Sequence, residues 1–232
     1  MKNLFAPLGA LGLLCCVAIP AAADINLSSG TYTYTVTFDN NGNGDQNAPP
    51  SFTAPTVTTL ASGWVTGLTD GIGDSGQWIA PNANQSNVLR NSADGYTVYD
   101  LTFSLVGFNA STAVLTMNLA ADDYVGVTLN GTPIFTPTAS QVANGMWTAA
   151  SGAFSINDTG SVFNSGSNTL EFTVPNFVAD GADSCCYPTG LDVAASVSAS
   201  PATVPEPSSA LPLGLAVAGA AYLLRRRVQS LR

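Results

Sequence analysis

The side chains best suited to bind a metal ion lie in one short segment, residues 39–45. Four side chains with oxygen ligands alternate there: Asp39, Asn41, Asn43 and Asp45. Carboxylate and amide oxygens are the ligands that calcium prefers, and Gly44 permits a sharp turn. Pro50 stands at the twelfth place, where a calcium loop between two helices carries a bidentate Glu. Two interpretations stay open, a looser calcium site and a solvated hairpin loop rich in Asn and Gly.

A second acidic feature is the pair Asp122 and Asp123, which precedes an apolar run. Adjacent residues on a strand point to opposite faces, so we expect these carboxylates not to form a side-by-side catalytic pair. Asp122 is a candidate metal ligand or a residue that stabilises the turn. A carboxylate-dependent glycoside hydrolase would need a more distant partner, such as Glu171 or Asp192, about 5–10 Å away. That hydrolase is the less favoured alternative, because any acidic chain offers such pairs by chance.

Three aromatic side chains are candidates for stacking on sugar rings: Trp64, Tyr124 and Trp147. Aromatic rings suit this role because they present a flat apolar face beside a polar tip. The alternative is that these rings belong to the hydrophobic core, which is where we expect Trp78.

Cys185 and Cys186 are adjacent in the chain. In an oxidising compartment, a vicinal disulfide between them would stiffen the loop before Tyr187. Adjacent Cα atoms lie about 3.8 Å apart, below the usual disulfide range, so this bond would be strained. Crosslinks between chains and free thiols are the alternatives.

The charged residues exclude several classes of function. The 232 residues include 6 Lys and Arg, 15 Asp and Glu and no His, which gives a formal charge of −9. Without His, the chain has no Ser-His-Asp or Cys-His catalysis and no His-ligated zinc. Phosphate binding needs Lys and Arg, so we expect no nucleic-acid partner. We expect a protein that is not an enzyme, with structural calcium as its one candidate cofactor.

Residues 24–197 contain repeated short segments that alternate apolar and polar residues, as half-buried strands do. The expected inward faces are Tyr32, Tyr34, Val36 and Phe38; Thr97, Tyr99, Leu101, Phe103 and Leu105; Ala113, Leu115, Met117 and Leu119; Val125, Val127 and Leu129; Leu170, Phe172 and Val174; and Leu191, Val193, Ala195 and Val197. Asn130 and Gly131 tolerate positive φ and predict a type I′ hairpin turn. We therefore predict one all-β domain, a sandwich of two sheets.

Residues 1–23 have the pattern of a secretory signal peptide. A basic start is followed by an apolar run, residues 4–19, and by an Ala-x-Ala ending. We expect this signal helix to be cleaved between Ala23 and Asp24. A permanent membrane anchor is the alternative, but the apolar run is short for a bilayer span.

The other end of the chain has three parts after a linker, residues 198–203. Pro205, Glu206 and Pro207 come first, and an apolar segment of 17 residues, 208–224, follows. That length is at the lower limit for a transmembrane helix. A cluster of positive charges completes the tail: Arg225, Arg226 and Arg227. Because arginines stay on the cytoplasmic side, the middle of the chain should lie outside.

This tail, residues 204–232, resembles the PEP-CTERM sorting signal of exported bacterial proteins, with an ordinary tail anchor as the alternative. The resemblance implies processing by an exosortase, a membrane cysteine transpeptidase that cuts near the Pro-Glu-Pro motif. It also implies a Gram-negative source that makes exopolysaccharide. The chain would pass through an intermediate anchored in the inner membrane and end at the cell surface or in the extracellular matrix.

Residues 77–197 resemble the galactose-binding-like jelly roll of carbohydrate-binding modules. Five segments carry this resemblance by their order: 77–81, 96–103, 121–131, 166–174 and 188–191. The resemblance implies a jelly-roll β-sandwich between the signal helix and the transmembrane helix. It further implies binding of extracellular polysaccharide without catalysis. A purely structural matrix or adhesion protein that recognises no sugar is the alternative.

Overall fold

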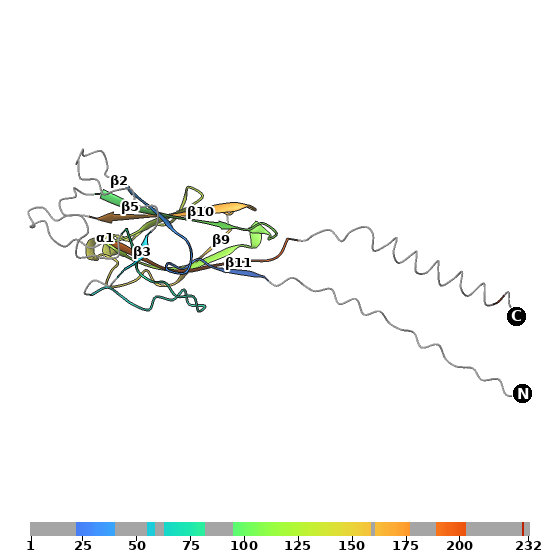
Figure 1. The fold of residues 1–232 in the computed structure, drawn as a ribbon, viewed down its shortest axis with the longest axis horizontal. Helices are drawn as coiled ribbons and strands as arrows, with labels where there is room; N and C mark the ends of the chain where they lie inside the picture. Colours follow the sequence, from blue (N-terminus) through green and yellow to red (C-terminus); the bar gives the residue numbers. More distant parts are fainter. Residues whose placement is uncertain are drawn as a thin grey trace, which may run out of the picture.

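The computed structural model describes residues 22–39, 55–58, 63–81, 95–158, 161–176, 189–202 and 229. Strands dominate this part of the chain, and its helical elements are short, namely α1 (Ala139–Asn144) and the 3₁₀ turn η2 (Ala110–Thr112). The strands form two antiparallel sheets that lie one above the other in Figure 1. The predicted all-β sandwich is therefore confirmed.

The first sheet is built around β11 and is called the β11 sheet below. Its strands follow the order β3-β4-β11-β6-β9, and β1 also pairs with β11. Their bounds are β1 Ala23–Asn26, β3 Thr56–Val57, β4 Ile79–Ala80, β6 Val114–Asp122, β9 Phe154–Asn157 and β11 Gly190–Ala199. Two strands share one edge of β11, because β1 pairs near Ala199 and β4 pairs at Leu191.

The second sheet, called the β5 sheet, follows the order β2-β5-β10-β7-β8. Its bounds are β2 Thr35–Asp39, β5 Gly95–Ser104, β7 Gly126–Leu129, β8 Thr132–Phe135 and β10 Ser167–Asn176. The two central strands pair along their whole length, from Ser104 with Ser167 to Gly95 with Asn176. This long antiparallel pair forms the middle of the sheet.

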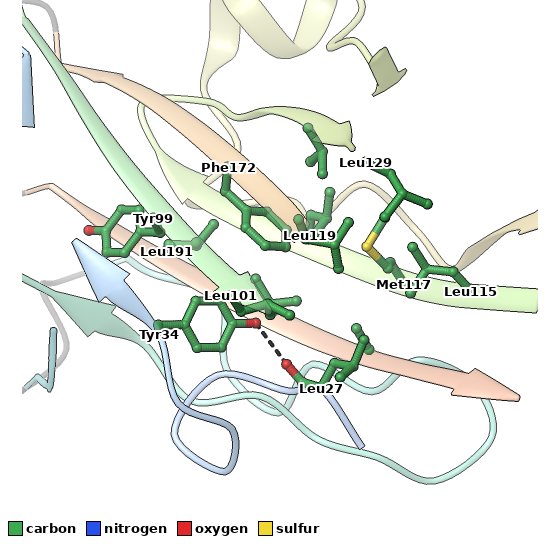
Figure 2. Close-up of a cluster of buried hydrophobic side chains, with 14 of the residues drawn as sticks. Leu27, Tyr34, Tyr99, Leu101, Leu115, Met117, Leu119, Leu129, Phe172 and Leu191 are labelled. Carbon is green, nitrogen blue, oxygen red and sulfur yellow. Dashed lines mark hydrogen bonds between the residues drawn. The ribbon is translucent and has the colours of Figure 1, made fainter. Parts of the chain in front are cut away.

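One continuous core fills the space between the two sheets, and Figure 2 shows part of it. Alternate residues of the long strands point inward, as their sequence pattern predicts. Those exposed by 2% or less include Tyr99, Leu101, Phe103, Leu115, Met117, Leu119, Leu170, Phe172, Val174, Leu191, Val193, Ala195 and Val197. Burial of each large apolar side chain contributes about 1.5–3 kcal/mol, so this core is the main source of stability.

The strand predicted over residues 31–38 begins later than expected, because β2 starts at Thr35. The backbone N–H groups of Thr31 and Tyr32 both donate to the carbonyl of Ser28, which makes a turn in place of a ladder. Tyr34 still points into the core, where its hydroxyl donates to the carbonyl of Leu27 at 2.8 Å (Figure 2). Tyr34 and Val36 are buried as predicted and Tyr32 is half-buried, whereas nothing is described of the Phe38 side chain. The predicted start of the strand is wrong.

The hairpin between β7 and β8 turns at Asn130 and Gly131, with φ angles of 51° and 79°. Positive φ at both central residues is the signature of the predicted type I′ turn. The Asn130 side chain also holds neighbouring segments together, since its Oδ1 accepts from the N–H of Thr169 and its Nδ2 donates to Val162 and Asn168.

A second, smaller core covers the outer face of the β11 sheet and was not predicted. Its buried members are Trp64, Leu68, Trp78, Ala120 and Ala194. The segment 63–81 therefore packs over the sheet as a partial third layer. As a result, nearly every residue of β11 is buried on both faces of the strand.

The sandwich has two ends that carry different parts of the chain. At the Ala199 end, Ala23 pairs with Ala199, and Phe108 forms a bridge with Pro201. At the opposite end, called the Asp122 end, Asp122 pairs with Gly190 and the N–H of Asp123 donates to the carbonyl of Pro175. The segments that lead to both predicted sorting signals thus lie side by side, at the end away from Asp122.

Among the described residues, no helix combines the length and the apolar character needed to cross a bilayer. The predicted signal peptide, apart from its last two residues, lies outside the described residues. The predicted sorting tail also lies outside them, apart from Gln229.

Candidate functional site

Asp122, the last residue of β6, is the centre of the candidate site. Its side chain is 8% exposed, and its Oδ2 accepts a 2.9 Å hydrogen bond from the indole N–H of Trp64. Its backbone carbonyl accepts a bond from the hydroxyl of Thr189, just before β11. The buried carboxylate needs a donor such as the Trp64 indole, because an unpaired buried charge is strongly destabilising.

The peptide bond between Asp122 and Asp123 is cis. The pKa of Asp122 rises to about 7, because burial disfavours its charged form. The bond from Trp64 lowers this pKa, whereas the charge of Asp123 and a hydrogen bond with its side chain raise it. The carboxyl of Asp123 therefore lies close enough to that of Asp122 to raise its pKa. Strand alternation does not extend to Asp123, since β6 ends at Asp122.

Trp64 is buried, with 6% of its surface exposed, and it stacks on Trp78. The two ring centroids are 4.0 Å apart, and the ring planes meet at 26°. A side chain at Gly190 would collide with the Trp64 ring and crowd the Trp78 ring, so a glycine as the first residue of β11 lets both rings pack against the sheet. The burial of Trp64 agrees with its alternative interpretation as a core residue.

Two other aromatic candidates, Tyr124 and Trp147, are half-buried near the same carboxyls. Tyr124 follows Asp123 directly, and its pKa is raised by burial, then by Tyr96, then by Asp123. Backbone hydrogen bonds connect Trp147 to the same region. Its carbonyl accepts from the N–H of Val65, and the N–H of Met146, the residue before it, donates to the carbonyl of Asp123.

The structure therefore brings together five residues at the Asp122 end, four of which the sequence singled out: Trp64, Asp122, Tyr124 and Trp147. The fifth is Asp123, and we call the set the acid–aromatic cluster. The sequence analysis named Asp123 only as the neighbour of Asp122 before an apolar run, and not as a site residue. Two carboxyls and two half-buried rings can offer hydrogen-bond acceptors and apolar faces to a polar ligand.

The predicted calcium ligands are only partly within the described residues. Asp39 ends β2, and its backbone pairs with Tyr96 at the Asp122 end. Asn41, Asn43 and Asp45 lie outside the described residues. Within the described part of the chain, no three Asp, Glu, Cys or His residues come together in a way that could hold a metal ion.

Of the two distant carboxylates considered for glycoside hydrolysis, Glu171 lies in the β5 sheet, whereas Asp192 lies on the same outer face of the β11 sheet as Asp122. Glu171 pairs with Asp100 and Thr128 in the β5 sheet, whereas Asp192 belongs to β11 in the other sheet. Asp192 pairs with Ala120, two residue pairs from the Asp122–Gly190 pair along the β6–β11 ladder. The rings of Trp64 and Trp78 lie over Gly190, which pairs with Asp122. Asp192 lines a pocket that Asp122 does not share.

The remaining predicted site residues have simple outcomes. Ala23 and Asp24, at the predicted signal cleavage point, form the start of β1 and pair with Ala199 and Ser198. The others lie outside the described residues: Cys185, Cys186, Pro205, Glu206, Pro207, Arg225, Arg226 and Arg227.

No family model matches the chain, and no curated protein matches it.

Proposed function

We propose that this chain is an exported protein of the cell surface or extracellular matrix, whose β-sandwich binds extracellular polysaccharide through the acid–aromatic cluster. It is a PEP-CTERM protein of a Gram-negative bacterium, processed by an exosortase. Its domain has the galactose-binding-like jelly-roll topology. It is not an enzyme, and structural calcium held by the loop after Asp39 supports the Asp122 end.

The observation that carries the proposal is the position of the cluster. The strands next to both predicted sorting signals pair at the Ala199 end, with Ala23 opposite Ala199. The cluster is built at the other end, where Asp122 pairs with Gly190. A domain tethered through residues 203–232 would thus direct the cluster away from the membrane and toward the matrix.

The chemistry of the cluster suits a sugar chain better than a charged polymer. Half-buried rings at Tyr124 and Trp147 provide apolar faces for the flat side of a sugar. Carboxyl oxygens at Asp122 and Asp123 accept hydrogen bonds from hydroxyl groups. The acidic composition, 15 Asp and Glu against 6 Lys and Arg, disfavours polyanionic partners such as nucleic acid.

A purely structural matrix or adhesion role is the second candidate, and one observation favours it. Trp64 is buried, stacks on Trp78 and bonds to Asp122, which is what a stabilising core feature requires. In that case the cluster would only hold the segment 63–81 on the sheet, and no sugar would bind.

Cosedimentation with exopolysaccharide tests the proposal and separates the two candidates. The full chain, solubilised in detergent, is mixed with exopolysaccharide from an exosortase-containing bacterium, and the bound fraction is measured. We expect wild type to be retained and the Trp147→Ala variant to lose at least about tenfold in affinity. Val142→Ala, an exposed change on α1 near the same end, is the control and should bind normally.

Retention of Trp147→Ala at the wild-type level, or no retention of wild type, would contradict the sugar-binding proposal and favour the structural role. A thermal melt of each variant shows whether the fold survives.

The sorting proposal has its own test. Coexpression with an exosortase should shorten the chain near Pro205–Pro207, as mass spectrometry would detect, and a Glu206→Ala chain should stay intact.

A further inference from the structure

A pocket of about 280 Å³ lies on the outer side of the β11 sheet, apart from the acid–aromatic cluster. Residues from three segments line it, including Thr58, Thr66, Gln77, Trp78 and Asp192. Its volume is just below the range typical of sites for drug-sized ligands, so it suits one small molecule. Thr66 and Gln77 are exposed at the pocket, whereas Asp192 and Trp78 are buried in its wall.

Asp192 is only 1% exposed, yet it is poorly supplied with hydrogen bonds. Among the described residues, its side chain accepts one hydrogen bond, from the hydroxyl of Ser29 to Oδ1 at 3.4 Å. That hydroxyl has a single hydrogen and a much closer acceptor, the carbonyl of Gln77 at 2.6 Å. The bond to Asp192 is therefore weak, and most of the acceptor capacity of a buried carboxyl that lines the pocket is unused.

No positive side chain compensates for this carboxyl within the described part of the chain, which contains no Lys or Arg. Burial raises the pKa of Asp192 to about 7, although the Ser29 bond lowers it. A buried carboxyl without adequate donors is destabilising. A ligand that brings hydroxyl groups would satisfy it, which is a reason for such a residue to line a cavity.

The other walls define the chemistry of the ligand. Thr66 and Gln77 offer a hydroxyl and an amide, which both donate and accept hydrogen bonds. Trp78 offers an apolar surface held in place, because its indole N–H donates to the carbonyl of Val65 at 2.7 Å and its ring stacks on Trp64. An anion would be repelled by Asp192, and a metal ion would find only one carboxylate. A neutral molecule with many hydroxyl groups fits all of these walls.

We infer that this pocket binds one neutral sugar residue, with Asp192 accepting its hydroxyl hydrogens and Trp78 packing against its ring. The pocket shares no lining residue with the acid–aromatic cluster, although Trp78 stacks on Trp64 of that cluster, so the inference does not rest on the proposed function. A polysaccharide protein with both sites would hold a chain at one end and a single sugar unit on the flank of the sheet.

The test uses the full chain in detergent and three probes, the methyl glycosides of galactose, glucose and mannose, with binding measured by saturation-transfer NMR and calorimetry. We expect at least one of them to bind. Above about pH 7, where the carboxyl is charged, Asp192→Asn should weaken that binding about tenfold or more, because it removes the charged acceptor. Thr66→Val should weaken it severalfold, while the matched control Thr69→Val, on the same segment but outside the pocket, should bind as wild type does.

Thermal melting of each variant shows whether it folds. If Asp192→Asn does not fold, the comparison of Thr66→Val with Thr69→Val still tests whether the pocket binds the glycoside. No binding of any probe to wild type, or equal binding by Thr66→Val and Thr69→Val, would overturn the inference. Trp147→Ala separates the two proposals, because it should lose polysaccharide but keep the methyl glycoside. If calcium raises the melting temperature of wild type but not that of Asp192→Asn, the pocket binds a cation, and the inference that it binds a sugar is overturned.

Discussion

The indole N–H of Trp64 donates a 2.9 Å hydrogen bond to Oδ2 of Asp122, across 58 residues of chain. This bond connects the segment 63–81 to the end of β6, and it places a polar contact inside the small outer core. It also gives a buried carboxyl the donor that its burial requires. The bond therefore couples the third layer of the fold to the candidate binding end.

Removing the Trp64 donor should destabilise the fold. We expect Trp64→Phe to lower the free energy of unfolding by about 1–3 kcal/mol, because it leaves Asp122 buried without its strongest partner. Urea unfolding measures the loss. In the Trp64→Phe background, Asp122→Asn should recover part of it, since a neutral amide is less costly to bury. An unchanged midpoint in Trp64→Phe would show that the bond does not stabilise the fold.

Two buried tyrosines should respond in opposite ways when their hydroxyls are removed. The Tyr99 hydroxyl has no hydrogen-bond partner among the described residues, whereas the Tyr34 hydroxyl donates to Leu27 (Figure 2). We expect Tyr99→Phe to be neutral or stabilising and Tyr34→Phe to cost about 1 kcal/mol. Chemical unfolding of the two variants makes the comparison. A loss in Tyr99→Phe as large as that in Tyr34→Phe would point to a partner, such as a buried water, for Tyr99.

The hairpin turn at Asn130 allows backbone and side-chain effects to be separated. Asn130→Gly keeps the positive φ but loses the three side-chain hydrogen bonds, while Asn130→Ala loses both. We expect the free energy of unfolding to be highest for wild type, lower for Asn130→Gly and lowest for Asn130→Ala. The two variants should differ by about 1 kcal/mol or more. If the alanine variant proves as stable as the glycine variant, the positive φ carries no cost.

The stability of the fold should decrease as the pH rises between the unfolded and the folded pKa of Asp192. Its pKa is about 7 in the folded chain and 3.8 when unperturbed, so between these values the folded state holds a proton that the unfolded state has lost. The contribution of Asp192 is therefore most favourable below about pH 4 and declines up to about pH 7.

The matched variant for this pH effect is Asp192→Asn, which cannot ionise. We expect its melting temperature, relative to wild type, to rise between pH 5 and pH 8 by a few degrees, which corresponds to about 1 kcal/mol or more. Asp122 titrates in a similar range in both proteins, so it cancels in the difference. If the difference in melting temperature between the two proteins does not change with pH, the pKa of Asp192 in the folded chain is not raised.

The sequence predicted the main core well, because burial of one face leaves a period of two in the residue types. In β6, the predicted inward residues Leu115, Met117 and Leu119 are all fully buried. The second core could not be predicted from the sequence pattern, for a physical reason. The outward residues of β11, such as Ala194 and Ser196, are small or polar and resemble a solvent face, yet segment 63–81 covers them.

The candidate site was predicted in part. Asp122, Tyr124 and Trp147 were named from residue type alone, but their proximity depends on pairing between distant segments, which the pattern does not encode. Asp192 was considered only as a distant carboxylate. Its role in a pocket follows from the packing of residues 57–58 and 66–78 over β11, and no local motif marks that packing.

The central claim is that the Asp122 end binds polysaccharide while the Ala199 end faces the anchor. Hydrogen exchange of the full chain, with and without exopolysaccharide, tests it most directly. The account predicts slower exchange around residues 122–125 and 145–148, with no change around residues 106–112 and 198–202. Protection confined to residues 106–112 and 198–202, or no protection anywhere, would contradict it.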